Sequence, residues 1–187
     1  TRTYTITDGC LNFTTIDQTI NIDDTELPVV TGTPTLTAIE GCSIADLPAA
    51  ETTVLGLEAL VGMTSIDDAC TVDADLDVTF SDAAPTGACP FTVVRTYKIT
   101  DECNNEVEIT HTITIDDNIN PTGSAPDDFS IAGGAVPAED INLVIDEADN
   151  CTVNPIVTFV DDQSDGGVCP EIITRTYRIT DDCGNSI

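Results

Sequence analysis

The 187-residue sequence contains no Trp, one His, one Met and only five Lys and Arg residues, against 34 Asp and Glu residues. The formal net charge of -29 excludes a binder of polyanions such as nucleic acid, because like charges repel. No apolar run reaches the roughly 20 residues that span a bilayer as a helix, so we expect no membrane insertion. The sequence shows no signal peptide and does not begin with Met, and we expect it to be part of a longer chain.

Composition nevertheless favours a folded protein. Hydrophobic residues make up 41% of the chain, chiefly as short runs of Val, Ile and Leu, which is not typical of a disordered acidic tail. The eight Cys include no C-x-x-C pair and there is only one His, which argues against a zinc site. Disulfides are the simpler interpretation, and they place the chain in an oxidising, extracytoplasmic compartment.

The clearest pattern is a decapeptide that recurs as TRTYTITDGC at 1–10, VRTYKITDEC at 94–103 and TRTYRITDDC at 174–183. The first two copies are followed at constant spacing by a strand-like segment, an IDD motif and Pro, and the last two are preceded by VTF and Cys-Pro motifs. Repetition in a fixed register predicts tandem copies of one structural unit. The predicted domains are the C-terminal hairpin of a truncated repeat at 1–28, a complete repeat at 29–121 and a repeat lacking its last strand at 122–187.

Apolar and polar residues alternate within these blocks. In FTVVRTYKITD (91–101), Val93, Tyr97 and Ile99 share one face, and EVEITHTITID (106–116) alternates in the same way. A polar turn joins the two segments, which predicts a hairpin. Many short strands with one buried face predict an all-β fold of tandem antiparallel immunoglobulin-like β-sandwich repeats.

The predicted strands suggest how the cysteines pair. If the VTF strand and the RTY strand form a hairpin, Cys70 and Cys103 lie almost symmetrically about its turn, and so do Cys151 and Cys183. Each bond would close the same end of a domain and add roughly 3 to 4 kcal/mol of stability in the chain-entropy account.

The remaining cysteines leave two schemes open. Cys42 would pair with Cys89, but Gly134 stands at the position equivalent to Cys42 in the third repeat. Sequence alone does not exclude a competing scheme. That scheme consists of the pairs Cys70 with Cys89 and Cys151 with Cys169.

The repeated motif also carries a resemblance. RTYxITDxC followed by NN or GN, then QTINIDD or HTITIDD and Pro, resembles the HYR-related immunoglobulin-like repeats of large surface adhesins of gliding Bacteroidota, the SprB-type motility adhesin among them. In that family the repeats form the extracellular shaft of an adhesin exported by the type IX secretion system. The resemblance implies a structural role in cell adhesion or gliding at a bacterial cell surface. It also implies neighbouring repeats as partners, with surface polysaccharide or substratum bound by a tip outside this chain.

Catalysis is not expected. His111 is the only His, and the repeat alignment places Gln18 in the same position, which is unsuitable for a general base. Arg2, Arg95 and Arg175 recur on the face of the motif's Tyr, and we expect them to pair with local carboxylates and stack on aromatic rings rather than bind a ligand.

Acidic residues recur at three places in each repeat: the incoming linker, the loop before the VTF strand and the turn after the RTY strand. In an antiparallel sandwich these lie at one end, so the carboxylates should converge. Unit charges about 4 Å apart repel by roughly 1 to 4 kcal/mol near a surface, and calcium, which takes 6 to 8 oxygens, would relieve this. IDDNINP also resembles the acidic, proline-ended linkers of cadherin-type repeats, where calcium stiffens the junction. The alternative is that these Asp residues cap turns or solvate the surface. The candidate calcium ligands are Asp23, Asp24, Asp67, Asp68 and Asp101 for the middle repeat, and Asp116, Asp117, Asp146, Asp149 and Asp181 for the third.

Two functions follow from these observations. The first is a non-catalytic structural repeat of a long extracellular adhesin or surface filament shaft, stiffened by disulfides and calcium. The alternative is a glycan- or surface-binding immunoglobulin-like module appended to a secreted enzyme. Sugar-binding modules stack aromatic side chains on sugar rings, whereas this chain has three Tyr, five Phe and no Trp, which favours the shaft.

Overall fold

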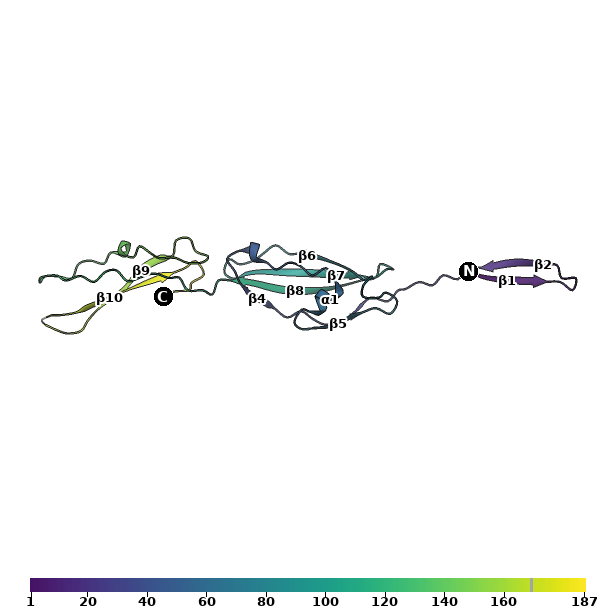
Figure 1. Ribbon diagram of the computed structural model, residues 1–187, viewed down its shortest axis with the longest axis horizontal. Coiled ribbons are helices and arrows are strands. Elements are labelled where there is room, and N and C mark those ends of the chain that lie inside the picture. Colours follow the sequence, from purple (N-terminus) through teal and green to yellow (C-terminus); the bar gives the residue numbers. More distant parts are fainter. Residues whose placement is uncertain (169) are drawn as a thin grey trace. The chain divides into compact units, whose positions relative to one another are not determined.

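The computed structural model describes residues 1–168 and 170–187. Strands predominate and helices are short, so the fold is all-β, as predicted (Figure 1). Among the described residues, no helix is long and apolar enough to cross a membrane. The strands are β1 (Arg2–Thr7), β2 (Phe13–Gln18), β3 (Val29–Gly32), β4 (Thr37–Glu40), β5 (Met63–Asp67), β6 (Asp77–Asp82), β7 (Phe91–Thr100), β8 (Glu106–Asp116), β9 (Ile156–Ser164) and β10 (Ile173–Thr180). The helical segments are η1 (Ile44–Asp46), α1 (Val54–Glu58) and η2 (Ile141–Leu143).

The described residues form two compact units. Unit 1 consists of Thr1–Gly32, Glu51–Thr79 and Tyr97–Ile109, and unit 2 consists of Thr33–Ala50, Phe80–Thr96 and Thr110–Ile187. Strands β6, β7 and β8 contribute residues to both units. The repeat boundaries stay predictions. We use them to name equivalent positions: the first repeat is 1–28, the middle repeat 29–121 and the third repeat 122–187.

Two small antiparallel sheets belong to unit 1. Strands β1 and β2 form a hairpin in which Tyr4 lies opposite Ile16. Strands β3 and β5 pair from Val29 opposite Asp67, with a register shift at Gly32, whose φ of 90° suits a residue without Cβ. Helix α1 precedes β5 in the chain and contacts it, and its Leu57 is completely buried, which removes this apolar side chain from water.

The central sheet has the strand order β4-β8-β7-β6. The predicted hairpin is present as β7 and β8, which neighbour each other in the sheet and are joined by the turn at 101–105. The predicted apolar face of β7 is buried, with Val93, Tyr97 and Ile99 at most 1% exposed. On β8, Ile113 and Ile115 are buried in the same alternating pattern. Period-two alternation therefore located these strands and their buried faces correctly.

Strand β4 differs from the antiparallel expectation, because it pairs in parallel with β8, from Thr37 opposite Ile113 to Glu40 opposite Asp116. The chain leaves the ladder of β3 before Pro34, which has no N–H to donate and interrupts a strand. The residues after Pro34 then pair with a different strand. An immunoglobulin-like sandwich stays a prediction; the all-β class and the antiparallel hairpins are observed.

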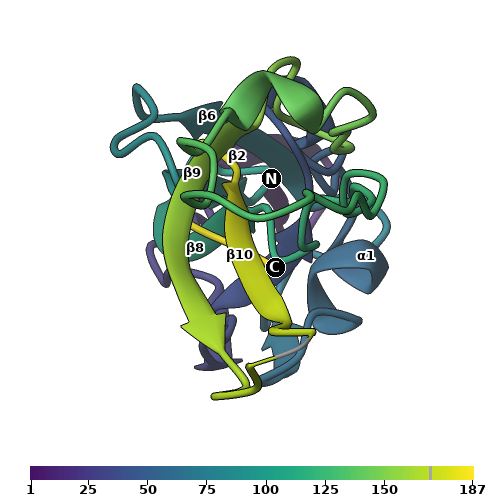
Figure 2. The ribbon, with the colours of Figure 1, turned by 90° about the vertical axis from the view of Figure 1, so that its left-hand side faces the viewer.

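Two of the three recurring arginines, Arg95 and Arg175, make the contacts that the sequence predicted. The Arg95 side chain on β7 contacts Asp82 through two hydrogen bonds, and its guanidinium lies 5.2 Å from the ring centroid of Phe80. Strands β9 and β10 of the third repeat run antiparallel side by side (Figure 2), and Arg175 on β10 makes the same contacts with Asp162 and Phe159. Each of these two arginines therefore links its own strand to the preceding strand, β7 to β6 and β10 to β9.

Candidate functional site

The turn after the RTY strand is built by one aspartate. In the middle repeat, Asp101 Oδ1 accepts hydrogen bonds from the backbone N–H groups of Cys103 and Asn105, both at 2.8 Å. Its Oδ2 accepts a hydrogen bond from Asn105 Nδ2 at 2.7 Å. Asp181 and Asn185 repeat these contacts in the third repeat. The short Asp side chain thus replaces backbone partners within a tight turn.

The asparagine of this turn also holds the incoming linker. Asn105 Nδ2 donates to the backbone carbonyl of Asp24 at 3.1 Å, and Asn185 Nδ2 donates to that of Asp117 at 2.8 Å. The sequence analysis missed these asparagines. Their signal was present, since the spacing Asp-x-Cys-x-Asn occurs in all three copies of the motif, and Asn12 makes the corresponding contacts in the first.

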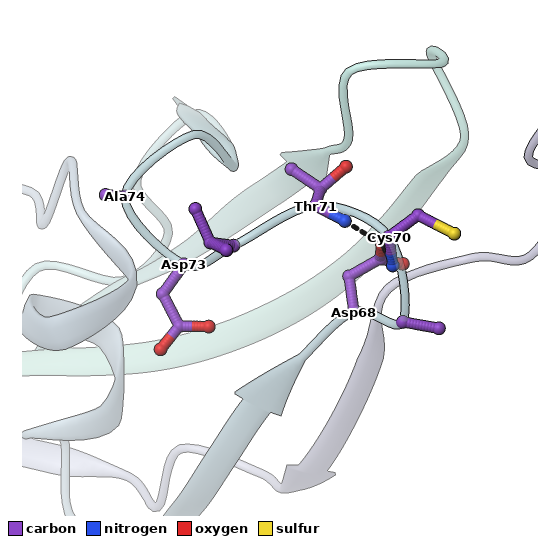
Figure 3. A pocket seen from close by; sticks show the side chains of 7 residues that line it. Asp68, Cys70, Thr71, Asp73 and Ala74 are labelled. Atoms are coloured by element: carbon purple, nitrogen blue, oxygen red, sulfur yellow. Dashed lines mark hydrogen bonds between the residues drawn. The ribbon is translucent and has the colours of Figure 1, made fainter.

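The loop before β6 is organised by a second aspartate. Asp68 Oδ1 accepts hydrogen bonds from the backbone N–H groups of Cys70 at 2.9 Å and Thr71 at 2.7 Å, the latter drawn in Figure 3. The Thr71 hydroxyl in turn accepts from the N–H of Glu102, which ties the loop to the turn. Asp149 repeats the first two contacts in the third repeat. A shallow hollow follows this single loop, over residues 68–74 (Figure 3).

Linker, loop and turn bring three carboxylates together in each repeat. One ligand oxygen from each member lies within 4.8 Å of the others, in one cluster inside unit 1 and one inside unit 2. The predicted convergence of acidic groups is therefore observed for one aspartate from each element. The linker cluster of the middle repeat consists of Asp24, Asp68 and Asp101, and that of the third repeat consists of Asp117, Asp149 and Asp181.

The other four predicted ligands lie outside these two clusters. Asp67 is exposed at the end of β5, and Asp116 is half-buried at the end of β8, each one residue before a cluster member. Successive side chains of an extended backbone point in opposite directions, so only one member of each pair can enter the cluster. Asp23 is likewise exposed. Asp146 instead accepts a hydrogen bond from the N–H of Ser124 at 2.9 Å. The Ser124 side chain, and after it this N–H, lower the pKa of Asp146.

Both clusters contain carboxylate oxygens that are buried but make no hydrogen bond within the described protein. They occupy the same two positions: Asp24 Oδ2 and Asp68 Oδ2 in the middle repeat, Asp117 Oδ2 and Asp149 Oδ1 in the third. Asp117 is only 2% exposed. Leaving one buried polar atom unsatisfied costs about 1 to 3 kcal/mol, and more when it is charged. In each of the two repeats, two such oxygens lie close to a third carboxylate. A bound cation would compensate their negative charge.

Local hydrogen bonds favour the ionised form of two of these carboxylates, Asp149 and Asp101. The backbone N–H of Thr152, with that of Cys151, lowers the pKa of Asp149 despite burial. Burial acts to raise the pKa of Asp101, but hydrogen bonds from Asn105 and Cys103 outweigh it and the pKa is lowered. A set of charged oxygens with no nitrogen or sulfur donor suits a hard cation such as calcium.

Two disulfides are present among the described residues, and they correct the predicted pairing. Cys42 is bonded to Cys151, and Cys89 is bonded to Cys183, with Cα atoms 4.9 and 5.4 Å apart. Both bonds lie inside unit 2, and each joins the middle repeat to the third. Two disulfides indicate an oxidising, non-cytoplasmic compartment, as predicted. The predicted pairs Cys70–Cys103, Cys151–Cys183 and Cys42–Cys89 are wrong.

The competing scheme is also wrong, since Cys89 and Cys151 have other partners, while Cys169 itself lies outside the described residues. The physical reason is strand length. Strand β7 has 10 residues and spans about 33 Å, so Cys89 before it and Cys103 after it lie at opposite ends of the repeat. Cys42 follows β4, which ends opposite the last residue of β8. Cys42 therefore lies with Cys89 at the exit end of the repeat, where the chain leaves β8 for the next linker.

The remaining candidate is the single histidine. His111 is 5% exposed on β8, with Nε2 2.8 Å from the Thr37 hydroxyl, and burial is the main cause that lowers its pKa. These contacts place it among packed strands. Comparisons with protein-family models, with curated proteins and with solved structures found no match to this chain, so its function is argued from the geometry of the repeats.

Proposed function

We propose that this chain is part of the shaft of a long extracellular filament or adhesin on a bacterial surface, with no catalysis of its own, and that calcium and disulfides hold its repeats together. The observation that carries the proposal is the acidic cluster, which is built twice from the same elements and the same hydrogen bonds. Units that join through identical contacts generate a regular array. The surface location, adhesion and gliding follow from the sequence resemblance.

Three carboxylates are the proposed calcium ligands of each junction. The linker, the loop and the turn each supply one, so the ion would connect three segments that are distant in the sequence. Calcium takes 6 to 8 oxygens, and water and backbone carbonyls would supply the remainder. With three charged ligands, we expect a Kd of about 10⁻⁴ to 10⁻³ M, the range of extracellular modules.

The linker aspartate gives the ion its mechanical role. Asp117 follows the last residue of β8 directly, and its backbone carbonyl is already held by Asn185. Calcium bound to its carboxylate would fix the side chain as well. Without calcium, Asp117, Asp149 and Asp181 repel one another. Their ligand oxygens lie within 4.8 Å of one another, which is shorter than the screening length of about 8 Å, so monovalent salt would mask this repulsion only in part.

Calorimetric titration with calcium chloride tests the site. The unmodified chain should bind two ions, one in each cluster. Asp117→Asn removes the charge of a buried ligand and should leave one ion bound, whereas the neighbouring Asp116→Asn, outside the carboxylate cluster, should leave two. If the unmodified chain binds no calcium at about 10 mM, tenfold above the expected Kd range, the aspartates are turn caps and the calcium proposal fails.

Small-angle scattering with calcium and with chelator tests the shaft. We expect the maximum dimension and the flexibility of the unmodified chain to change when chelator removes calcium. Chelator should change them less in Asp117→Asn, which keeps only one of the two sites. A flexible, collapsed profile under both conditions contradicts the shaft even if calcium binds.

A further inference from the structure

Two cysteines of unit 1 carry free thiols although they occupy disulfide positions. Cys70 and Cys103 are exposed and unbonded. Their equivalents in the third repeat are Cys151 and Cys183, which bond to Cys42 and Cys89. Unbonded and bonded cysteines therefore stand at the same positions of two repeats.

The local structure around the two sets is the same. The N–H of Cys70 donates to Asp68 as that of Cys151 donates to Asp149. The N–H of Cys103 donates to Asp101 at 2.8 Å, and the third repeat has the corresponding bond at 2.9 Å. The free cysteines are thus held in the loop and turn conformations that present their equivalents for bonding.

We propose that Cys70 and Cys103 form disulfides with a preceding repeat of the same kind, through cysteines at the positions of Cys42 and Cys89. The inference rests on the proposed function of the chain as a repeat array. Each junction that follows a repeat with cysteines at both of these positions would then contain two covalent links beside its acidic cluster, and such repeats in succession would form a covalent ladder.

The positions along the repeat support this partner. Cys42 and Cys89 lie at the exit end, where β8 ends, whereas Cys70 and Cys103 lie at the entry end, beside Asp24 of the incoming linker. Exit cysteines of one repeat bond to entry cysteines of the next in the one junction where both sets are present. Figure 3 shows the Cys70 sulfur directed away from its own loop.

A bond between Cys70 and Cys103 themselves is the alternative outcome. It is disfavoured because their equivalents bond to separate partners instead of to each other.

Each new bond requires an oxidant, and a small-molecule or protein disulfide supplies it. One cysteine thiolate attacks that disulfide and releases a thiol, and the second cysteine thiolate then displaces the other half. The two protein thiols lose two electrons and two protons, and one disulfide is reduced to two thiols.

Duplication of the middle repeat within the full chain tests the ladder. Pro28 and Pro121 are equivalent, so a second copy of 29–121 inserted after Pro121 reproduces the natural junction. After refolding in oxidised and reduced glutathione, peptide mapping without reduction should show links of Cys42 to Cys70 and of Cys89 to Cys103. The control is the unextended chain, in which neither link should occur. Alkylation of Cys70 and Cys103 should fall to half, since one of two copies is protected.

A Cys70–Cys103 link in the extended chain, or full alkylation of both cysteines, would overturn the proposal. Retention of the Cys42–Cys151 and Cys89–Cys183 links reports that the extended chain has folded. As a second measurement that needs no extension, the double variant Cys70→Ser, Cys103→Ser of the original chain should keep both of those links and its unfolding temperature; a loss of either assigns the thiols an internal role and contradicts the ladder. These readouts are separate from calcium binding and scattering, so the ladder and the shaft can fail independently.

Discussion

The ion pair of Arg95 and Asp82 supports a sharp prediction about stability. The Arg95 side chain is 4% exposed, with Nε 2.7 Å from Asp82 Oδ1 and Nη2 2.9 Å from Oδ2, and Nη1 donates to the carbonyl of Pro48 at 3.0 Å. Asp82→Asn keeps the shape of the side chain and removes its charge. The negative charge beside the buried guanidinium is then lost, and the neutral amide offers one acceptor oxygen where the carboxylate offered two.

The magnitude follows from burial. Removing one partner of a buried pair costs about 3 to 5 kcal/mol, and because the Asp82 side chain is 27% exposed we expect the lower limit, about 3 kcal/mol. The third repeat supplies a matched control. Arg175 and Asp162 have the same bidentate geometry, but the arginine side chain is 17% exposed, so Asp162→Asn should cost clearly less stability than Asp82→Asn, because solvent screens the pair.

Hydrogen exchange followed by mass spectrometry measures this difference, because amides in a strand exchange through opening reactions whose free energy can be read locally. A loss of about 3 kcal/mol should accelerate the slowest amides of β7 by about 100-fold in Asp82→Asn, since each 1.4 kcal/mol is a factor of ten. Asp162→Asn should accelerate those of β10 by less than about tenfold. Equal acceleration in both, or an unchanged β7, would refute the reasoning that burial sets the value of the pair.

Two further predictions concern the same strands. Burial lowers the pKa of His111 below 6.5, so the unfolded chain binds the proton more readily than the folded chain. Stability should therefore be constant above about pH 6.5 and should fall as the pH drops from 6.5 toward the folded-state pKa. Thermal unfolding between about pH 5 and pH 8 measures the slope, and His111→Gln should remove it; an unchanged slope would assign it to other groups. Gly41→Ala places a Cβ 2.8 Å from Ile115 Cγ2 and should cost about 1 to 3 kcal/mol by overpacking. In the same thermal measurement Gly9→Ala, whose Cβ meets no atom within 4 Å, should have no effect, and equal losses in both variants would contradict the packing argument.

Much of the fold could be predicted because alternation reports directly on burial. Val93, Tyr97 and Ile99 alternate with polar residues, and their burial follows from that pattern. The convergence of Asp24, Asp68 and their equivalents was also predictable, since linker, loop and turn recur at fixed distances from the strands. Which member of each acidic pair enters the cluster depends on side-chain direction, which the sequence spacing does not specify.

The disulfide partners could not be predicted from symmetry within one hairpin. The sequence argument correctly placed Cys70 and Cys103 at one end of the repeat. It paired Cys42 with Cys89, however, and did not consider that the partners of both could belong to the next repeat. The parallel pairing of β4 was missed for a related reason. Alternation identifies a strand and its buried face, whereas the choice of neighbouring strand depends on how the chain crosses after Pro34.

The repeated contacts of linker, loop and turn also bear on how such a chain can change its length. Asp24 and Asp117 meet the same partners, so a junction does not distinguish between copies. Genetic recombination between equivalent codons would add or remove one whole repeat and leave every remaining junction chemically complete. Recombination between unequal positions would instead produce a junction that lacks one of the three carboxylates. Selection against such junctions would allow length to vary only in whole repeats.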